Sequence, residues 1–66
     1  MNIRVNGEVI AVSSGVTVQA LLAQLGIIVN RAVVEYNGAI LPQQEWPSVS
    51  LREHDSLEIV SFVGGG

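Results

Sequence analysis

The sequence predicts an α+β fold in which one main helix lies across one face of a mixed sheet. Three observations predict it: stretches with a period of two, two Asn-Gly dipeptides and one stretch with helical spacing. The chain has 66 residues, of which 48% are hydrophobic, so it can bury one small core and is not expected to be disordered. We therefore expect a single domain over residues 1–63 and a flexible glycine tail over residues 64–66.

Residues 2–12 are predicted to form a β-hairpin. Ile3 and Val5 alternate with polar residues, and residues 8–12 form the returning strand. Asn6 and Gly7 lie between the two strands and tolerate the positive φ that a tight turn requires. The following Ser-Ser-Gly segment is expected to be a loop.

Residues 17–25 are predicted to form the helix. Thr17 suits the N-cap, and Val16 can pack against Leu21 as a hydrophobic staple. Gly26 suits the left-handed position after the helix. One apolar stripe should face the sheet, formed by Val18, Leu21, Leu22 and Leu25.

The middle of the chain is predicted to contain a crossover and a second hairpin. Residues 27–29 are apolar and suggest a buried extended crossover, followed by a turn at residues 30–31. Residues 32–36 are predicted as a strand, and Asn37-Gly38 is the second tight-turn signal. A short strand over residues 39–41 should return from that turn.

The last third of the chain is predicted to contain an irregular segment and the final strand. Pro42 restricts the preceding strand to an edge, and one helical turn is expected between Pro42 and Pro47. Trp46 in that turn should cover the core. A short extended piece over residues 49–51 and a polar turn over residues 53–56 come next. The final strand is expected over residues 57–63.

This order of elements is the β-grasp arrangement. A hairpin, a helix, a strand, an irregular segment and a final strand can form one sheet with the helix across one face. If the final strand lies beside the first in the centre of the sheet, the end of the chain leaves from a rigid strand.

Charge and composition exclude several classes of protein. Three Arg, six acidic residues and the absence of Lys give a net charge of −3, which disfavours nucleic-acid binding and favours a partner with a basic surface. The absence of Cys excludes disulfides, thiolate metal sites and a cysteine nucleophile. The apolar runs are too short to span a membrane, so no membrane association is expected.

The glycine tail is the first candidate functional feature. One interpretation is an ordinary frayed terminus. The alternative is a thin arm in which the carboxylate of Gly66 is the reacting group, because Gly64 and Gly65 lack side chains and can pass through a narrow channel in a partner enzyme. Three extended residues reach about 10 Å, and adenylation by ATP would make the carboxylate reactive.

The final strand carries the second candidate feature. Leu57, Ile59, Ser61 and Val63 should share one face, and Glu58, Val60 and Phe62 the other. We expect Phe62 to anchor a docking surface beside the tail, while Val60 suits docking and ordinary exposure about equally. Glu58, with Glu53 and Asp55, could steer a basic partner.

The remaining polar residues predict no catalytic or metal site. His54 has no further ligands at a suitable spacing and is expected to be a solvated turn residue. Ser13 and Ser14 lack both a base and the strand-to-helix motif of a nucleophile. We therefore expect no catalytic residues and no metal ligands in this chain.

Over its full length the sequence resembles the ThiS family, the ubiquitin-like sulfur carriers of thiamine biosynthesis. The resemblance rests on the order and spacing of Val5-Asn6-Gly7-Glu8, Thr17-Val18 with Leu21-Leu22, Val34-Glu35-Tyr36-Asn37-Gly38, Ile40-Leu41-Pro42 with Trp46, Asp55 with Leu57-Glu58-Ile59-Val60, and Phe62-Val63-Gly64-Gly65-Gly66.

The resemblance implies a cytoplasmic carrier protein that is not an enzyme and binds no cofactor. A ThiF-like adenylyltransferase would use ATP to adenylate Gly66, a sulfur-donor system would convert the adenylate to a thiocarboxylate, and a ThiG-like thiazole synthase would take the sulfur. In family terms Gly65 and Gly66 are the essential pair. Alternatives are sulfur carriage for molybdopterin, amino acids or tRNA thiolation, a ubiquitin-like protein modifier, and a non-covalent binding module.

Overall fold

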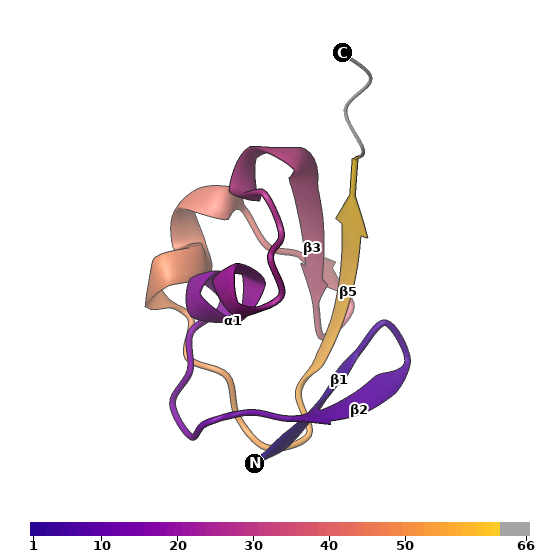
Figure 1. Cartoon of the computed structure of the whole chain (residues 1–66), viewed down its shortest axis with the longest axis vertical. Coiled ribbons are helices and arrows are strands. Elements are labelled where there is room, and N and C mark those ends of the chain that lie inside the picture. Colours follow the sequence, from indigo (N-terminus) through magenta and orange to yellow (C-terminus); the bar gives the residue numbers. More distant parts are fainter. Residues whose placement is uncertain (63–66) are drawn as a thin grey trace.

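Residues 1–62 form a five-stranded mixed sheet with their helices on one face (Figure 1). A computed structural model describes residues 1–62, so Val63 and the predicted tail over residues 64–66 lie outside the described residues. The strands are β1 (Asn2–Val5), β2 (Glu8–Ala11), β3 (Ala32–Tyr36), β4 (Ala39–Ile40) and β5 (Ser56–Ser61).

The order of the strands in the sheet is β2-β1-β5-β3-β4. β5 lies in the centre, parallel to β1 and antiparallel to β3, while β1–β2 and β3–β4 are antiparallel hairpins. The prediction that the final strand lies beside the first is therefore confirmed. In Figure 1, β5 runs away from the N-terminus toward the opposite end of the molecule.

Both predicted Asn-Gly turns are present. Asn6 and Gly7 have φ values of 51° and 84°, and Asn37 and Gly38 have φ values of 49° and 91°. These are left-handed conformations that asparagine and glycine adopt at low cost, which explains why each dipeptide closes a hairpin.

The helix α1 (Val18–Gln24) has the N-cap residue and the following glycine that its sequence predicts, and it ends one residue before the predicted boundary. The Thr17 hydroxyl accepts a hydrogen bond from the Ala20 N–H at 3.1 Å, and Gly26 has a φ of 73° after the helix. Of the predicted apolar stripe, Val18, Leu21 and Leu22 are buried.

Leu25, the last residue of the predicted stripe, lies on the side facing the sheet but is not buried like the other three. It is the C-cap residue of α1, and its side chain is 44% exposed.

The buried extended crossover predicted over residues 27–29 is confirmed only in part, because Ile28 is extended but not buried. The segment enters a 3₁₀ helix, η1 (Val29–Arg31), and the Ile28 side chain is 62% exposed. The Arg31 N–H donates to the Ile28 carbonyl at 3.0 Å. This tight turn leaves Ile28 on the outside, while Ile27 and Val29 pack against the core.

The segment between β4 and β5 contains a second 3₁₀ helix, η2 (Gln43–Ser48), where one helical turn is predicted. Trp46 is 2% exposed and its indole N–H donates to the Leu41 carbonyl at 3.0 Å, so it covers the core as expected. The extended piece predicted after it is reduced to an isolated bridge between Ser50 and Thr17.

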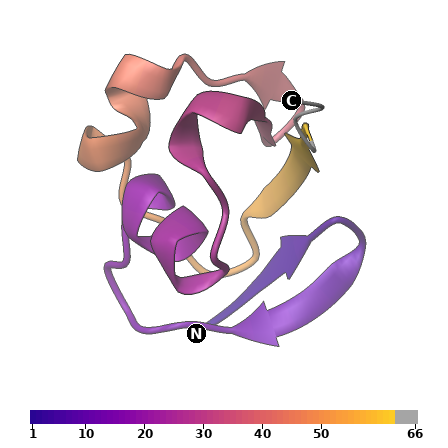
Figure 2. The ribbon, with the colours of Figure 1, turned by 45° about the horizontal axis from the view of Figure 1, so that its top comes forward.

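The core lies between the sheet and the helical layer, which Figures 1 and 2 show on one side of the sheet. Its buried hydrophobic residues come from β1, α1, β3, η2, β5 and two loops: Ile3, Val16, Val18, Leu21, Leu22, Val34, Trp46, Leu51, Leu57 and Ile59. Within residues 1–62 no helix covers the other face of the sheet.

Candidate functional site

β5 has two different faces, as the alternation of its residues predicts. Leu57 and Ile59 are 0% and 7% exposed and belong to the core. Glu58 is exposed on the opposite face, where Val60 is 56% exposed. Phe62, directly after the strand, is also 56% exposed. The predicted docking residues are thus accessible, while the predicted tail residues Gly64, Gly65 and Gly66 lie outside the described residues.

The end of β5 is held firmly by β3. The two strands pair from Tyr36 opposite Leu57 to Ala32 opposite Ser61. One residue beyond the strand, the Phe62 N–H still donates to the Arg31 carbonyl at 2.6 Å. The backbone that leads toward residues 63–66 is therefore attached to the sheet as far as Phe62.

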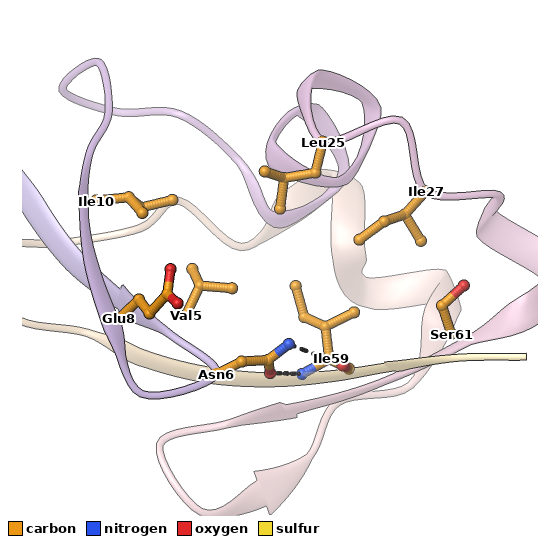
Figure 3. A pocket seen from close by; sticks show the side chains of 8 residues that line it. All are labelled: Val5, Asn6, Glu8, Ile10, Leu25, Ile27, Ile59 and Ser61. Carbon is orange, nitrogen blue, oxygen red and sulfur yellow. Dashed lines mark hydrogen bonds between the residues drawn. The ribbon is translucent and has the colours of Figure 1, made fainter.

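On the β1 side, β5 extends beyond its partner and an asparagine side chain completes the pairing. The Asn6 amide oxygen accepts from the Ile59 N–H at 2.7 Å, and the Asn6 amide N–H donates to the Ile59 carbonyl at 3.2 Å (Figure 3). The side chain thus takes the place of the next backbone residue of β1. An unpaired backbone group at this buried residue would cost about 1–3 kcal/mol.

The second asparagine turn fixes the start of β5. The Asn37 side-chain oxygen accepts from the Ser56 N–H at 2.9 Å, and its amide N–H donates to Asp55 at 3.2 Å. Asp55 also accepts from the Tyr36 hydroxyl at 2.7 Å and from the Arg52 N–H at 2.8 Å. Asp55 therefore joins the end of β3 and the turn after it to the loop that precedes β5, and its role is structural.

This position of Asp55 corrects its predicted role in steering a basic partner. Its side chain is only 8% exposed. Glu53 is also engaged, because its carboxylate accepts from the Asn2 N–H at 2.7 Å. Of the three acids assigned to steering, Glu58 is the one on the outer face of β5.

The hydrogen bonds around Asp55 shift two pKa values. Burial acts to raise the pKa of the Asp55 carboxyl, but the hydrogen bonds from Tyr36, the Arg52 backbone and Asn37 together outweigh it and lower the pKa below its usual 3.8. The hydrogen bond to Asp55, followed by burial, raises the pKa of Tyr36 above its usual 10.0. The ionised carboxylate with a neutral tyrosine is therefore the favoured state.

Asp55→Asn is expected to lower the free energy of unfolding at neutral pH by about 1–3 kcal/mol, because the amide keeps one acceptor oxygen and its NH2 group cannot accept the hydrogen bonds made to the other. In the native chain this stabilisation is present above pH 3.8 and is lost as the pH falls through the lower pKa of the folded state. Urea unfolding at neutral and acidic pH measures both effects. The variant should lose less stability in acid than the native chain.

Glu45→Gln, at an exposed carboxylate on η2, is the matched control and should keep the acid dependence of the native chain. An Asp55→Asn chain that loses as much stability in acid as this control would contradict the structural role of the ionised carboxylate.

An open groove of about 410 Å³ lies between the β1–β2 hairpin, the end of α1 and β5 (Figure 3). Its lining is mainly apolar, with Leu25 and Ile27 on one side and Glu8 at the hairpin. Leu25, directly after α1, lies over the groove. It contains no pairing of a nucleophile with a base, so its side chains offer contact surface and no covalent chemistry.

Neither a metal site nor a membrane span is visible in the described part of the chain. Residues 1–62 contain no group of three or more His, Cys, Asp and Glu side chains placed to hold a metal ion. None of their helices has the length and apolar character needed to cross a bilayer. His54 is exposed in a turn with a φ of 70°.

Comparison with known proteins gives one consistent family. The model of the ThiS family matches residues 2–66. The chain is 40% identical, over 50 residues and 76% of each chain, to the sulfur carrier protein ThiS of Bacillus subtilis. It is similar to the crystal structure of the thiamine biosynthesis protein ThiS from Geobacter metallireducens, with a TM-score of 0.85, 30% identity and full coverage of both chains.

Two longer relatives are thiazole synthases. The chain is 41% identical over all 66 residues to the thiazole synthase of Paramagnetospirillum magneticum and 38% identical to that of Magnetococcus marinus. It spans 20% of the length of each of these two relatives.

Proposed function

The chain belongs to the ThiS family, and from this premise we propose that it carries sulfur, as a thiocarboxylate on Gly66, for the synthesis of the thiazole ring of thiamine. The observation that carries the proposal is the family match, which extends to residue 66 and includes the terminal glycines. The β-grasp fold and the similarity to thiazole synthases over all 66 residues support it.

The proposed chemistry takes place on the terminal carboxylate, inside partner proteins. In a ThiF-like adenylyltransferase, a carboxylate oxygen of Gly66 would attack the α-phosphate of ATP, and pyrophosphate would leave. A sulfide-level nucleophile from a sulfur-donor system would then attack the acyl carbon. The bond from that carbon to the phosphate oxygen breaks, AMP leaves, and a thiocarboxylate remains for a ThiG-like thiazole synthase.

The part of the chain described by the structure supplies a rigid support for this chemistry. β5 is paired with β3 as far as Phe62 and is fixed by the Asn6 and Asn37 side chains. A partner that holds the outer face of β5 therefore also fixes the point from which residues 63–66 extend. Accurate placement of a reacting group contributes strongly to the rate of such reactions.

Reconstitution with an adenylyltransferase of the ThiF type, ATP and a sulfide source tests the proposal. Intact mass spectrometry should show one oxygen of the chain replaced by sulfur, with no change when ATP is omitted. Adducts with amines of other proteins that resist boiling and thiol would instead identify a protein modifier.

Phe62→Ala is expected to raise the KM for adenylation about tenfold or more and to leave the melting temperature nearly unchanged. Phe62 is 56% exposed beside the reacting segment, and loss of an aromatic anchor commonly costs an interface more than 1 kcal/mol. Initial rates at varied carrier concentration and thermal unfolding measure the two quantities.

Val9→Ala is the matched control, because Val9 is 60% exposed but lies on β2, opposite Arg4 and far from the end of β5. Its KM should stay close to that of the native chain. A sharp fall in the melting temperature of Phe62→Ala would instead assign Phe62 to the folded core.

A further inference from the structure

The outer face of the sheet contains a pair of like charges. The register of β3 and β5 places Glu35 directly opposite Glu58, and both side chains are exposed. Side chains that lie directly opposite each other in a sheet have Cβ atoms about 4.5–5.5 Å apart, and like charges in this position destabilise the fold. The pairing therefore reduces the stability of the isolated chain.

Apolar side chains border this acidic pair. The next pair on the same face, toward the end of β5, is Val33 opposite Val60, which are 37% and 56% exposed. On the other side of Glu35, Ile40 of β4 lies directly opposite it and is 62% exposed. The apolar neighbours give a partner area to bury, and the two carboxylates favour a partner with a complementary positive charge.

The register places one cation, Arg4, near the Glu58 side of the pair. Arg4 on β1 is opposite Ser56, two residues before Glu58 on the same strand. It is therefore a diagonal neighbour of Glu58, whereas Glu35 lies one strand further away, on β3. The four charged and apolar residues Glu35, Glu58, Val33 and Val60 thus form a surface with an unbalanced negative charge, hereafter the acid–valine surface.

The acid–valine surface is open to a partner. The helices of residues 1–62 all lie on the other face of the sheet (Figure 1). The surface continues through Val60 toward Phe62 and thus toward the end of the chain.

We propose that the acid–valine surface docks the activating adenylyltransferase, through a basic side chain of that enzyme which inserts between Glu35 and Glu58 while apolar side chains cover Val33 and Val60. An arginine fits best, because its planar guanidinium can donate to two carboxylates at once. The proposal rests on the sulfur-carrier function above. The repulsion between the two carboxylates, which costs stability in the free chain, is relieved in the complex.

Glu35→Gln and Glu58→Gln test the proposal, because they keep the shape of the side chain and remove one charge. Each is expected to raise the melting temperature of the free chain by about 1–5 °C. Each should also raise the KM for adenylation about tenfold. A residue that matters only for folding would not raise the stability of the free chain while weakening its binding to the enzyme.

Salt dependence gives a second readout. Raising the ionic strength from about 0.1 M to about 1 M shortens the Debye length from about 10 Å to about 3 Å. At high salt the KM of the native chain should therefore rise until it is close to the KM of both variants. The KM of the double variant should rise by less than the product of the two single-variant increases, because both carboxylates share one cation.

Glu45→Gln is the control, since it makes the same change in net charge at an exposed residue of η2, in the helical layer. The proposal is overturned if both test variants have the KM of this control, or if neither raises the melting temperature. If the native chain itself is not adenylated, the sulfur-carrier function fails and this proposal falls with it. If the native chain is adenylated and the variants have the same KM as the native chain, only the docking surface is rejected.

Discussion

Deletion of Gly66 is expected to reduce adenylation of the chain at least about 100-fold while leaving its free energy of unfolding unchanged. The deletion moves the terminal carboxylate back by about 3.3–3.6 Å, the length of one extended residue. A misplacement of about 1 Å at a reacting centre can already cost about 100-fold in rate. Stability should not change, because the buried hydrophobic core of the described chain lies between Ile3 and Ile59. Single-turnover adenylation and urea unfolding measure the two effects.

Gly66→Ala serves as the control for this deletion. It keeps the carboxylate the same number of residues from β5 and adds only a Cβ atom, so it should lose less activity than the deletion. A deletion variant that is adenylated at the native rate would show that the reacting carboxylate is not placed as we propose.

Leu22→Ala is expected to lower the free energy of unfolding by about 2–5 kcal/mol. Leu22 is completely buried on α1, where the helix covers the sheet. At about 0.05–0.15 kcal/mol per residue, a chain of 66 residues has a total stability of roughly 3–10 kcal/mol. The substitution should therefore remove a large part of that stability, and at the lower end it unfolds the domain. Urea unfolding followed by circular dichroism measures the loss.

Leu25→Ala makes the same chemical change at the end of the same helix, where the side chain is 44% exposed. Its cost should stay below about 1 kcal/mol, because much of the leucine surface is already in contact with water. Equal losses in the two variants would contradict the assignment of Leu22 to the core and Leu25 to the groove.

Much of the fold could be predicted because its signals are local. The positive φ of Asn6 and Asn37, the Thr17 cap and the glycine after α1 each depend on residues a few positions apart. The alternation along β5 likewise predicted that Leu57 and Ile59 share one face and that Glu58 and Val60 share the other. Once these elements are fixed, few arrangements can bury one helix against one sheet.

The features that could not be predicted depend on contacts between distant parts of the chain. Asn6 bonds to Ile59, 53 residues away, and nothing near position 6 shows that its side chain completes a strand. The buried position of Asp55 and the pairing of Glu35 with Glu58 depend on the same register. At residues 27–29, apolar composition favoured a buried extended crossover, but Val29 already belongs to η1 and Ile28 is exposed.

The candidate site was predicted in part. The exposure of Glu58, Val60 and Phe62 follows from the period of a strand, and the structure confirms that all three are exposed. The groove beside Leu25 could not be predicted, because the sequence pattern continues the apolar stripe past the point where α1 ends. The proposed chemistry at Gly66 comes from the family and from the glycines themselves, independently of the described residues.

The most direct test of the central claim is mass spectrometry of the protein isolated from the organism that produces it, with fragmentation of its C-terminal peptide. We predict a population in which Gly66 is the last residue and carries a thiocarboxylate in place of a carboxylate. A mature polypeptide that continues beyond Gly66, or one in which sulfur is absent from that position under conditions of active thiamine synthesis, would contradict the account.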